Sequence, residues 1–209
     1  TVKITANKDS VVRSKSFSIT VTGKPSEDYY LWVKGTSTMS GGYDNQPPMV
    51  VQGQSGVSLD PDNSAYPIGA YAYENGAGKT IRQDVCKSDE TVNGTLVYAQ
   101  ITTSDSGTRT VEFTTTNWTK AQKYTIRVEN TFDNRNSFKS DEVDVKVEKG
   151  AVTIVAAGDQ SYYLGEEIKF AGTNTETYET FLFIIGPNLP ANGAEIQPDD
   201  LDPRSNKVE

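Results

Sequence analysis

Two acidic turns contain the residue types that could bind a metal ion. They read LDPDNSA over residues 59–65 and QPDDLDPRS over residues 197–205. Calcium prefers several oxygen ligands from carboxylates and carbonyl groups in a flexible loop. Such ligands are offered by Asp60, Asp62, Asn63, Asp199, Asp200 and Asp202. Neither stretch has the twelve-residue calcium loop with its terminal glutamate, and Asp, Asn and Pro also build ordinary turns. We therefore expect no cofactor, with calcium at these turns as the alternative that stays open.

The stretch YENGAGKT, residues 73–80, ends like a phosphate-binding loop. That motif needs a first glycine five residues before its last one, and Tyr73 occupies the position. It also needs a following helix whose N-terminus meets the phosphate. Here TIRQDV, residues 80–85, alternates like a strand. We expect Gly76 and Gly78 to form a hairpin turn, and no nucleotide to bind.

Nucleophilic catalysis in its commonest forms is excluded because the chain contains no histidine. Serine–histidine and cysteine–histidine arrangements need that side chain as general base. Glycoside hydrolysis needs two carboxylates held a defined distance apart in a cleft, and no acidic residue here stands in a distinctive context. The single cysteine, Cys86, rules out an internal disulfide; it is either a small buried hydrophobic residue or a reactive thiol. The sequence predicts a protein that is not an enzyme.

Two Asn-X-Thr sequons, at Asn93 and Asn117, could carry N-linked glycans. Glycosylation requires an exported parent protein, and the opening TVKITANKD is typical of the interior of a longer chain. Lys plus Arg number 20 against 28 Asp plus Glu, so the net charge is −8. Without a basic stripe we expect no nucleic-acid partner. No apolar run reaches the roughly 18 residues that span a bilayer.

The elements that must position these residues are β-strands. Apolar and polar residues alternate, with the period of a half-buried strand, over residues 17–21, 95–103, 110–113, 124–128 and 142–147. Turn clusters such as TSDSGT at 103–108 separate them, and helical periodicity is scarce. The pattern predicts an all-β fold, an antiparallel immunoglobulin-like β-sandwich.

Two aromatic residues are expected to have structural roles in this sandwich. Tyr124 opens an alternating strand just after a bend, which is typical of a tyrosine corner with a buried ring and a hydroxyl bonded to backbone; the alternative is an ordinary strand tyrosine. Trp32, in YYLWVKG, is expected as the core aromatic of an earlier strand. Residues 36–67 form an unusually long connection, either a decorative insertion or a specialised surface. Only MVVQ within it is strand-like, at a sheet edge.

The chain repeats itself at an offset near 150 residues. The segment at residues 2–23, VKITANKDSVVRSKSFSITVTG, is similar in sequence to VTIVAAGDQSYYLGEEIKFAG at 152–172. The segment YYLWVKG at 29–35 is likewise similar to TFLFIIG at 180–186. We therefore predict a complete sandwich repeat over residues 1–148 and the first strands of a second, incomplete repeat over residues 149–209. The FLFII stretch is nearly all apolar, so we expect it to be buried on both faces. Residues 1–148, a neighbouring copy or further chain could cover it.

A family resemblance rests on FLFIIGPNLPANGAEI, residues 181–196, and on YAQITTSDSGTRTVEFTTTNWTKAQKYTIRVE, residues 98–129. Both look like the tandem β-sandwich repeat domains of methanogenic archaeal cell-surface proteins, of the surface-layer-like and adhesin-like class. The first repeat departs from the pattern, since VKGTSTMSGG at 33–42 lacks the proline-rich turn. The resemblance implies a non-catalytic structural segment of an exported surface-layer or envelope protein, located at the cell surface. Its partners would be neighbouring repeats of the same protein or lattice subunits.

The alternative function is an adhesin-type binding module that recognises carbohydrate or a partner cell surface. The aromatic residues that could stack on sugars are Tyr29, Tyr30, Tyr43, Tyr71 and Tyr73. Because Tyr71 and Tyr73 alternate in AYAYE, they share a face, and both lie either in the core or in a binding platform. We expect the core, and solvent exposure of the pair would favour the adhesin.

Overall fold

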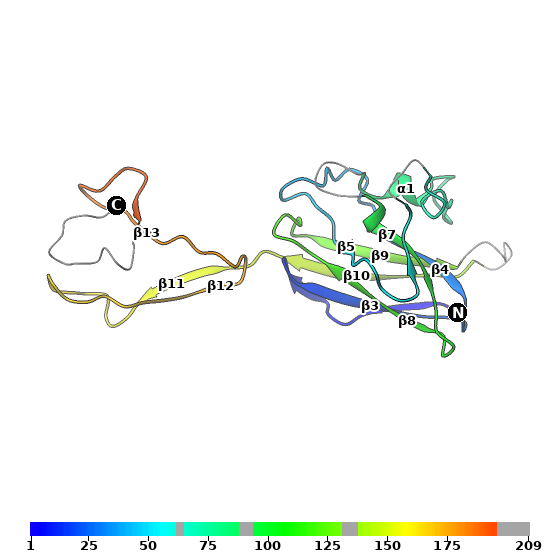
Figure 1. The fold of residues 1–209 in the computed structure, drawn as a ribbon, viewed down its shortest axis with the longest axis horizontal. Helices are drawn as coiled ribbons and strands as arrows, with labels where there is room; N and C mark the ends of the chain where they lie inside the picture. The colour runs from blue at the N-terminus through cyan, green and yellow to red at the C-terminus, as the bar shows by residue number, and fades with distance from the viewer. Residues whose placement is uncertain (62–64, 88–93, 131–137, 196–209) are drawn as a thin grey trace. The chain divides into compact units, whose positions relative to one another are not determined.

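The structure, a computed structural model, describes residues 1–61, 65–87, 94–130 and 138–195 (Figure 1). The chain divides into two compact units, Thr1–Lys149 and Gly150–Glu209, and each is described by itself below. Strands dominate both units, and the predicted fold class is confirmed: the protein is an all-β sandwich protein with antiparallel sheets. In the part of the chain that the structure describes, no helix is long and apolar enough to cross a membrane.

One sheet of the first unit has four antiparallel strands in the order β1-β3-β8-β5. These strands are β1 (Lys3–Ala6), β3 (Ser16–Thr22), β8 (Thr108–Thr114) and β5 (Met49–Val50). The edge strand expected within MVVQ is β5, which ends the sheet. Along β3, Phe17, Ile19 and Val21 are buried and the residues between them are only half-buried, because successive side chains point to opposite faces.

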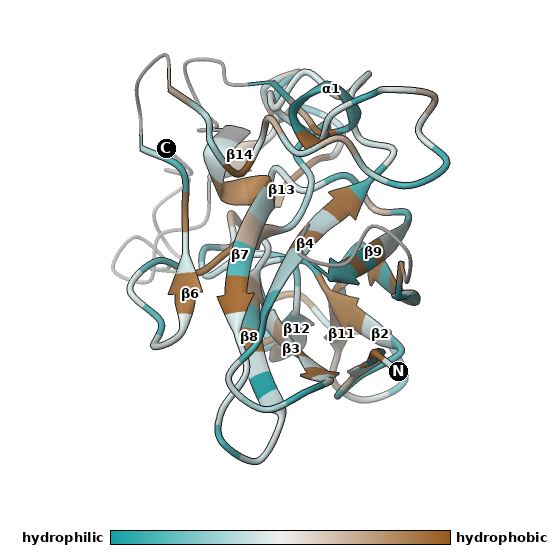
Figure 2. Cartoon of the chain, turned by 90° about the vertical axis from the view of Figure 1, so that its right-hand side faces the viewer, coloured by the Kyte–Doolittle hydropathy of each residue, from teal (hydrophilic) through white to brown (hydrophobic). Residues whose placement is uncertain are grey.

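The other sheet has six strands in the order β2-β10-β9-β4-β7-β6. Their bounds are β2 (Ser10–Val12), β10 (Ser140–Glu148), β9 (Lys123–Asn130), β4 (Asp28–Lys34), β7 (Tyr98–Thr102) and β6 (Val57–Ser58). All pairings are antiparallel except that of β2 with β10. Hydrophobic and hydrophilic bands alternate along β7 and β9 in Figure 2, as the sequence pattern predicts.

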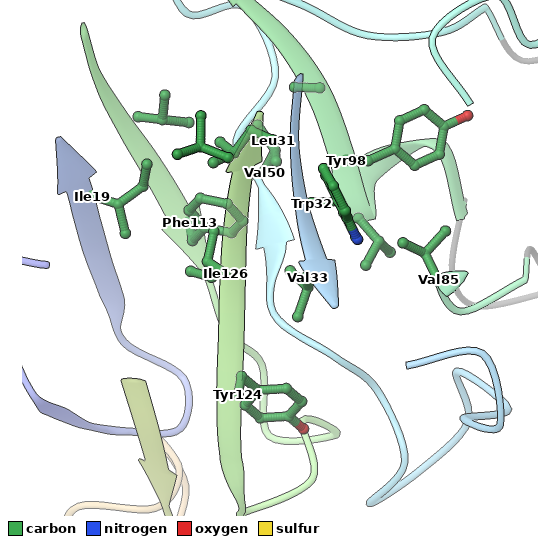
Figure 3. Packing of buried hydrophobic residues seen from close by; sticks show 14 of the residues in the cluster. Ile19, Leu31, Trp32, Val33, Val50, Val85, Tyr98, Phe113, Tyr124 and Ile126 are labelled. Atoms are coloured by element: carbon green, nitrogen blue, oxygen red, sulfur yellow. The ribbon is translucent and has the colours of Figure 1, made fainter. Parts of the chain in front are cut away.

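The core of the first unit lies between the two sheets (Figure 3). Phe17 and Phe113 of the smaller sheet stack with ring centroids 5.4 Å apart. Leu31 and Val33 of β4 are fully buried in the same cluster. Each large apolar side chain that is fully buried contributes about 1.5–3 kcal/mol, so this cluster dominates the stability of the unit.

Tyr124 lies at the start of β9, where the chain has crossed from the smaller sheet to the larger one. Its ring is buried, and its hydroxyl donates to the carbonyl oxygen of Lys120 at 2.7 Å, with the carbonyl of Gln46 at 3.2 Å. This is the arrangement of a tyrosine corner. Burial, with smaller contributions from Asp44 and Cys86, raises the pKa of this hydroxyl well above its usual value.

The long connection between β4 and β7 contributes a third layer. We call residues 59–61 and 65–87 the cover segment; it packs on the outer face of the six-stranded sheet. Tyr71 of this segment contacts Tyr30 of β4 with ring centroids 4.2 Å apart, and Tyr73 contacts Trp32 at 5.3 Å. The cover segment is therefore structural, since it buries a sheet face that would otherwise meet water.

Trp32 is fully buried and belongs to the hydrophobic core cluster, on the face of β4 that the cover segment covers. Neighbouring residues of a strand face opposite sides, so Trp32 points away from Leu31 and Val33 and toward the cover segment. Figure 3 shows it on the same side of β4 as Val85. Its indole Nε1–H donates to Oδ2 of Asp84 at 2.9 Å.

The stretch TIRQDV, expected as a strand, instead forms the single-turn helix α1 (Ile81–Asp84). The backbone N–H of Thr80 donates to the side-chain oxygen of Gln83 at 3.0 Å, half of a capping box whose Thr-x-x-Gln spacing is visible in the sequence. The turn expected around Gly76 and Gly78 is confirmed, because an antiparallel bridge between Ala72 and Thr80 closes it. A short 3₁₀ helix, η1 (Gly94–Val97), then leads into β7.

The second unit consists of two strand pairs over its described residues. Strand β11 (Val152–Ala156) pairs with β12 (Phe170–Asn174), and β13 (Phe183–Ile184) pairs with β14 (Ala194–Glu195), both antiparallel. The GPNLPANG stretch makes the turn between β13 and β14, with backbone bonds from Leu189 to Gly186 and from Gly193 to Pro190.

Candidate interaction surface

The hairpin of β11 and β12 repeats the pairing of β1 and β3. In the first unit Ile4 pairs with Val21 and Ala6 with Ile19. In the second unit Ile154 pairs with Gly172 and Ala156 with Phe170. The pairing gives an offset of 150 residues for the first strand and 151 for the second. Phe170 therefore takes the position of Ile19 in the second hairpin.

The two hairpins differ in what covers them. Ile4 and Ile19 are 5% and 0% exposed, whereas their counterparts Ile154 and Phe170 are 55% and 49% exposed. In the first unit β8 lies beside β3, and the six-stranded sheet packs across this face. The described part of the second unit has no counterpart of these strands. The apolar side of this hairpin is therefore open.

We call this side the open face. Side chains of directly paired residues lie on the same side of an antiparallel pair, so Val152, Ile154 and Phe170 share it. Thr153, Val155 and Thr173 occupy the reverse side. A groove of about 400 Å³ adjoins the hairpin and has no charged side chain in its wall. Its lining residues are Val152, Thr153, Ile154, Phe170, Ala171, Gly172, Thr173, Asn174, Thr180, Phe181 and Leu182.

The FLFII stretch adds to the exposed apolar surface of the second unit. Phe181, Phe183 and Ile185 are 83%, 59% and 71% exposed. Their counterparts lie in β4, the central strand, where β7 and β9 flank both edges. The expected burial on both faces is therefore not found in the described chain. The physical reason is that the flanking strands have no counterparts in its second unit.

The predicted metal-binding residues have only one member in the described chain. Asp60 is buried, and its carboxylate accepts bonds from the backbone N–H groups of Ile68 and Gly69 and from the Tyr98 hydroxyl, at 2.9, 2.8 and 2.6 Å. This carboxylate holds the cover segment to the sheet. The other five candidates, Asp62, Asn63, Asp199, Asp200 and Asp202, lie outside the described residues. The absence of a cofactor, with calcium at these turns as the alternative, stays a prediction.

The two predicted glycosylation sites have different outcomes. Asn117 is exposed in the turn that follows β8. Asn93 lies outside the described residues. Cys86 is fully buried, with its Sγ 3.2 Å from the carbonyl oxygen of Met39, which favours the interpretation as a small buried residue.

The five tyrosines proposed as a sugar platform do not form one surface. Tyr29 and Tyr71 are buried, and Tyr73 is half-buried against Trp32. The prediction that Tyr71 and Tyr73 both face inward is confirmed. Tyr43 is the exposed member of the set, at 68%, and its ring meets the edge of Trp118 with centroids 6.1 Å apart.

A buried charged cluster was missed by sequence reasoning. Arg127 and Glu129 of β9 occupy the outward positions of an alternating strand, which predicts exposure, yet Glu129 is 0% exposed because the cover segment lies over it. Arg127 contacts Glu129 at 2.5 Å and Glu142 at 2.8 Å. The sequence feature that could have predicted this burial is the neighbouring strand YYLWVK, because apolar residues on both of its faces are typical of a strand that is buried on two sides.

Comparisons with known proteins give only distant similarity to solved structures. No family profile matches the sequence, and no curated protein matches it. Among solved structures, the bacterial hydrophobin BslA is 10% identical with a TM-score of 0.31, over 70% of this chain and 98% of that one. AggA, the major subunit of aggregative adherence fimbriae type I from Escherichia coli, is 13% identical at 0.33, over 70% and 91%. The class 5 fimbriae chaperone CfaA is 7% identical at 0.28, over 93% and 79%. Likeness at this level does not indicate function.

Proposed function

We propose that this chain is a non-catalytic structural segment of an exported cell-surface protein that is built from tandem β-sandwich repeats. One observation carries the proposal: the hairpin of β1 and β3 recurs as β11 and β12 with matching pairing and apolar residues on the same face. A repeated sandwich is an economical way to build an extended wall or stalk. Its partners are neighbouring repeats or lattice subunits.

The contacts of three acidic side chains support a structural role. The carboxylate of Asp60 binds backbone of the cover segment, and that of Asp84 accepts from Trp32 and from the backbone of Gly35. Glu129 accepts from Tyr71 and Arg127. These three side chains hold layers together, and general acid–base catalysis would need them to face a substrate.

A location outside the cell is supported by the exposed Asn117 sequon and by the resemblance of the GPNLPANG turn to archaeal surface-layer-like repeats. The chain has a net charge of −8, so it lacks the positive charge that attracts the phosphates of nucleic acid. We therefore place the segment in a cell-surface or envelope protein of that class.

The test is surface labelling of intact cells that make the parent protein. A membrane-impermeant amine reagent should modify Lys8 and Lys79, exposed lysines of the first unit, in intact cells as fully as in lysed cells. Mass spectrometry of the peptide containing Asn117 reports glycosylation in the same experiment. Labelling that appears only after lysis would refute a surface location.

A second function, carbohydrate recognition, is favoured by the exposed ring of Tyr43, which packs edge to face with the half-buried Trp118. Exposed aromatic rings offer apolar faces on which sugars stack. A glycan array probed with the chain and with Tyr43→Ala tests it, with Tyr163→Ala as control because Tyr163 is 88% exposed in the other unit. Binding that only Tyr43→Ala abolishes would establish the adhesin; an array without signal would reject it.

A further inference from the structure

We propose that the rings of Tyr43 and Trp118 are the platform for a glycan attached to Asn117, whose first sugar packs against the exposed ring of Tyr43. The inference rests on the proposed function, because a chain acquires such a glycan only when it is exported. It goes further by giving the sugar a defined contact on the first unit. The ligand is a pyranose sugar that is covalently linked to the chain itself.

The first observation is the local structure of the sequon. Asn117 and Trp118 are the central residues of a tight turn, which the backbone N–H of Thr119 closes by donating to the carbonyl oxygen of Thr116 at 3.1 Å. The N–H of Trp118 donates to the hydroxyl of Thr116, also at 3.1 Å. Asn117 is exposed, whereas Thr119 is fully buried. The backbone that carries the acceptor asparagine is therefore fixed.

The second observation is that the connection between β4 and β5 brings Tyr43 to this turn. The N–H of Gln46 donates to the carbonyl oxygen of Trp118 at 3.2 Å, and the N–H of Lys120 donates to the carbonyl oxygen of Gln46 at 3.0 Å. The ring centroids of Tyr43 and Trp118 lie 6.1 Å apart, and the ring planes stand at 82° to each other. One of two nearly perpendicular rings thus belongs to the residue next to the acceptor asparagine.

The ring of Tyr43 is open to a ligand. Among the residues of the first unit that the structure describes, Tyr43 is the one large hydrophobic side chain that is exposed, at 68%. A single exposed tyrosine is ordinary on a protein surface. This one is distinguished by its contact with Trp118, which sets it beside a sequon. Aromatic rings offer the apolar faces on which sugars stack.

The loop that carries Tyr43 is held in place before any sugar arrives. The N–H of Asn45 donates to the carbonyl oxygen of Gly42 at 3.0 Å. Asp44 has φ +54, and its carboxylate accepts from the buried guanidinium of Arg13 at 2.9 Å. A loop that is already ordered loses little conformational freedom on contact, so more of the contact energy is kept.

Covalent attachment decides between this sugar and one from solution. A stacking contact with one ring is weak, and an untethered sugar needs several well-placed polar groups in addition. A tethered group meets its partner at an effective concentration in the millimolar range when the linker is short. The sugar begins at the side-chain amide of Asn117, one residue from Trp118, so its linker is short. The chain's own glycan is therefore the favoured occupant.

The experiment uses the full chain, secreted from a host that transfers N-linked glycans. Asn93→Gln is present in every variant, so that Asn117 is the remaining sequon. Mass spectrometry should find Asn117 occupied. Both tryptophans, Trp32 and Trp118, belong to the first unit, so their fluorescence reports the melting of that unit. The glycan should raise the melting temperature by about 2 °C or more relative to Asn117→Gln, as expected for one added aromatic contact.

The increase should depend on the ring of Tyr43 and on the first sugar. Tyr43→Ala should reduce it by at least half, whereas Tyr43→Phe keeps the ring and should keep the increase. Thr38→Ala, at an exposed position of the same connection, is the matched control and should also keep it, as should enzymatic trimming of the glycan to one sugar. An unmodified Asn117, an equal increase in Tyr43→Ala, or an increase lost on trimming would overturn the proposal.

A direct measurement separates packing from other effects, because a glycan can also stabilise a chain through its unfolded state. Nuclear Overhauser effects should connect protons of the first sugar with ring protons of Tyr43, and sugar protons above the ring should shift upfield. Both signals should disappear in Tyr43→Ala. Their absence from the folded, glycosylated chain would overturn the proposal even where the glycan stabilises the unit.

The outcome is separable from that of the proposed function, since surface labelling of cells reads location alone. If the parent protein is labelled on intact cells but the sugar does not contact Tyr43, the platform is rejected and the surface role stands. If the contact forms in the secreted chain but the parent protein is labelled only after lysis, the surface role is rejected and the contact stands.

Discussion

The hydroxyl of Tyr71 donates a 3.0 Å hydrogen bond to Oε2 of Glu129, and this contact joins the cover segment to the six-stranded sheet. The same oxygen accepts the backbone N–H of Glu74 at 3.3 Å, while Oε1 receives the guanidinium of Arg127. A fully buried carboxylate thus has partners on both layers. Arg127 continues the network to Glu142, which also binds Lys34 at 2.8 Å.

Replacing Glu129 should be costly. Glu129→Ala leaves the Arg127 charge and the Tyr71 hydroxyl without their main acceptor, and breaking a buried pair costs about 3–5 kcal/mol. For a unit of this size each kcal/mol lowers the melting temperature by roughly 2–4 °C, so a drop of about 6 °C or more is expected by calorimetry. Glu112→Ala, an exposed glutamate on β8, is the matched control and should move it by less than about 2 °C. Similar shifts in both would refute the network.

The tyrosine corner should contribute a smaller amount. Tyr124→Phe keeps the buried ring but removes the donor to Lys120 and Gln46, and such a hydrogen bond contributes about 0.5–1.5 kcal/mol net. Denaturant unfolding should show a lower midpoint with an unchanged slope. Tyr43→Phe alters an exposed ring and should leave the midpoint unchanged. No loss in Tyr124→Phe would mean that the hydroxyl bond is not needed.

Alkaline pH should destabilise the first unit. Burial raises the pKa of Tyr71, Tyr98 and Tyr124, with further increases from Glu129 at Tyr71 and from Asp60 at Tyr98. In the unfolded chain these hydroxyls ionise near their usual pKa of about 10. Above that pH the unfolded state binds fewer protons than the folded state, so stability falls as pH rises.

The measurement is tyrosinate absorbance followed together with circular dichroism as pH increases. Part of the absorbance step should coincide with loss of the β signal. The chain has 11 tyrosines; ionisation of all of them with the β signal intact would contradict the prediction.

The β7–β8 turn should depend on Gly107. It has φ +78, and a Cβ there would lie 2.6 Å from the carbonyl oxygen of Gly23. Gly107→Ala should therefore cost about 1–3 kcal/mol, since it adds a clash to backbone strain. Gly53→Ala is the control with a similar φ of +77 and open space around it, and it should lose less. Equal losses would show that φ alone matters.

The open face should bind a hydrophobic dye. A naphthalene-sulfonate probe becomes fluorescent in apolar surroundings, and exposed patches of this kind are unusual in isolated soluble domains. Ile154→Thr should reduce the fluorescence by at least half, because it removes a central apolar side chain of this face. Val155→Thr, on the reverse side and similarly exposed, should reduce it much less. Equal reductions would place the dye elsewhere.

Much of the fold was readable from local pattern. The alternation of Phe17, Ile19 and Val21 predicts a strand with one buried face, because side chains of a strand alternate strictly. The bend before Tyr124 predicts the tyrosine corner for the same local reason. The near repeat of Ile4 and Ile154 predicts two related units. The first two inferences depend on residues within one strand or turn, and the third on comparing two strands 150 residues apart.

Tertiary structure decided what alternation cannot express. Trp32 lies on a strand that has apolar residues on both faces, so the local pattern does not show which layer covers its side chain. The cover segment, which folds over this face of β4, provides that layer. Glu129 looked solvent-facing until that segment buried it. The hydrogen bonds of Asp60 with the backbone of Ile68 and Gly69 could not be read from its own turn. Exposure of Ile154, against burial of Ile4, depends on strands more than 100 residues away. Local pattern fixes which way a side chain points, and only long-range packing fixes what it meets there.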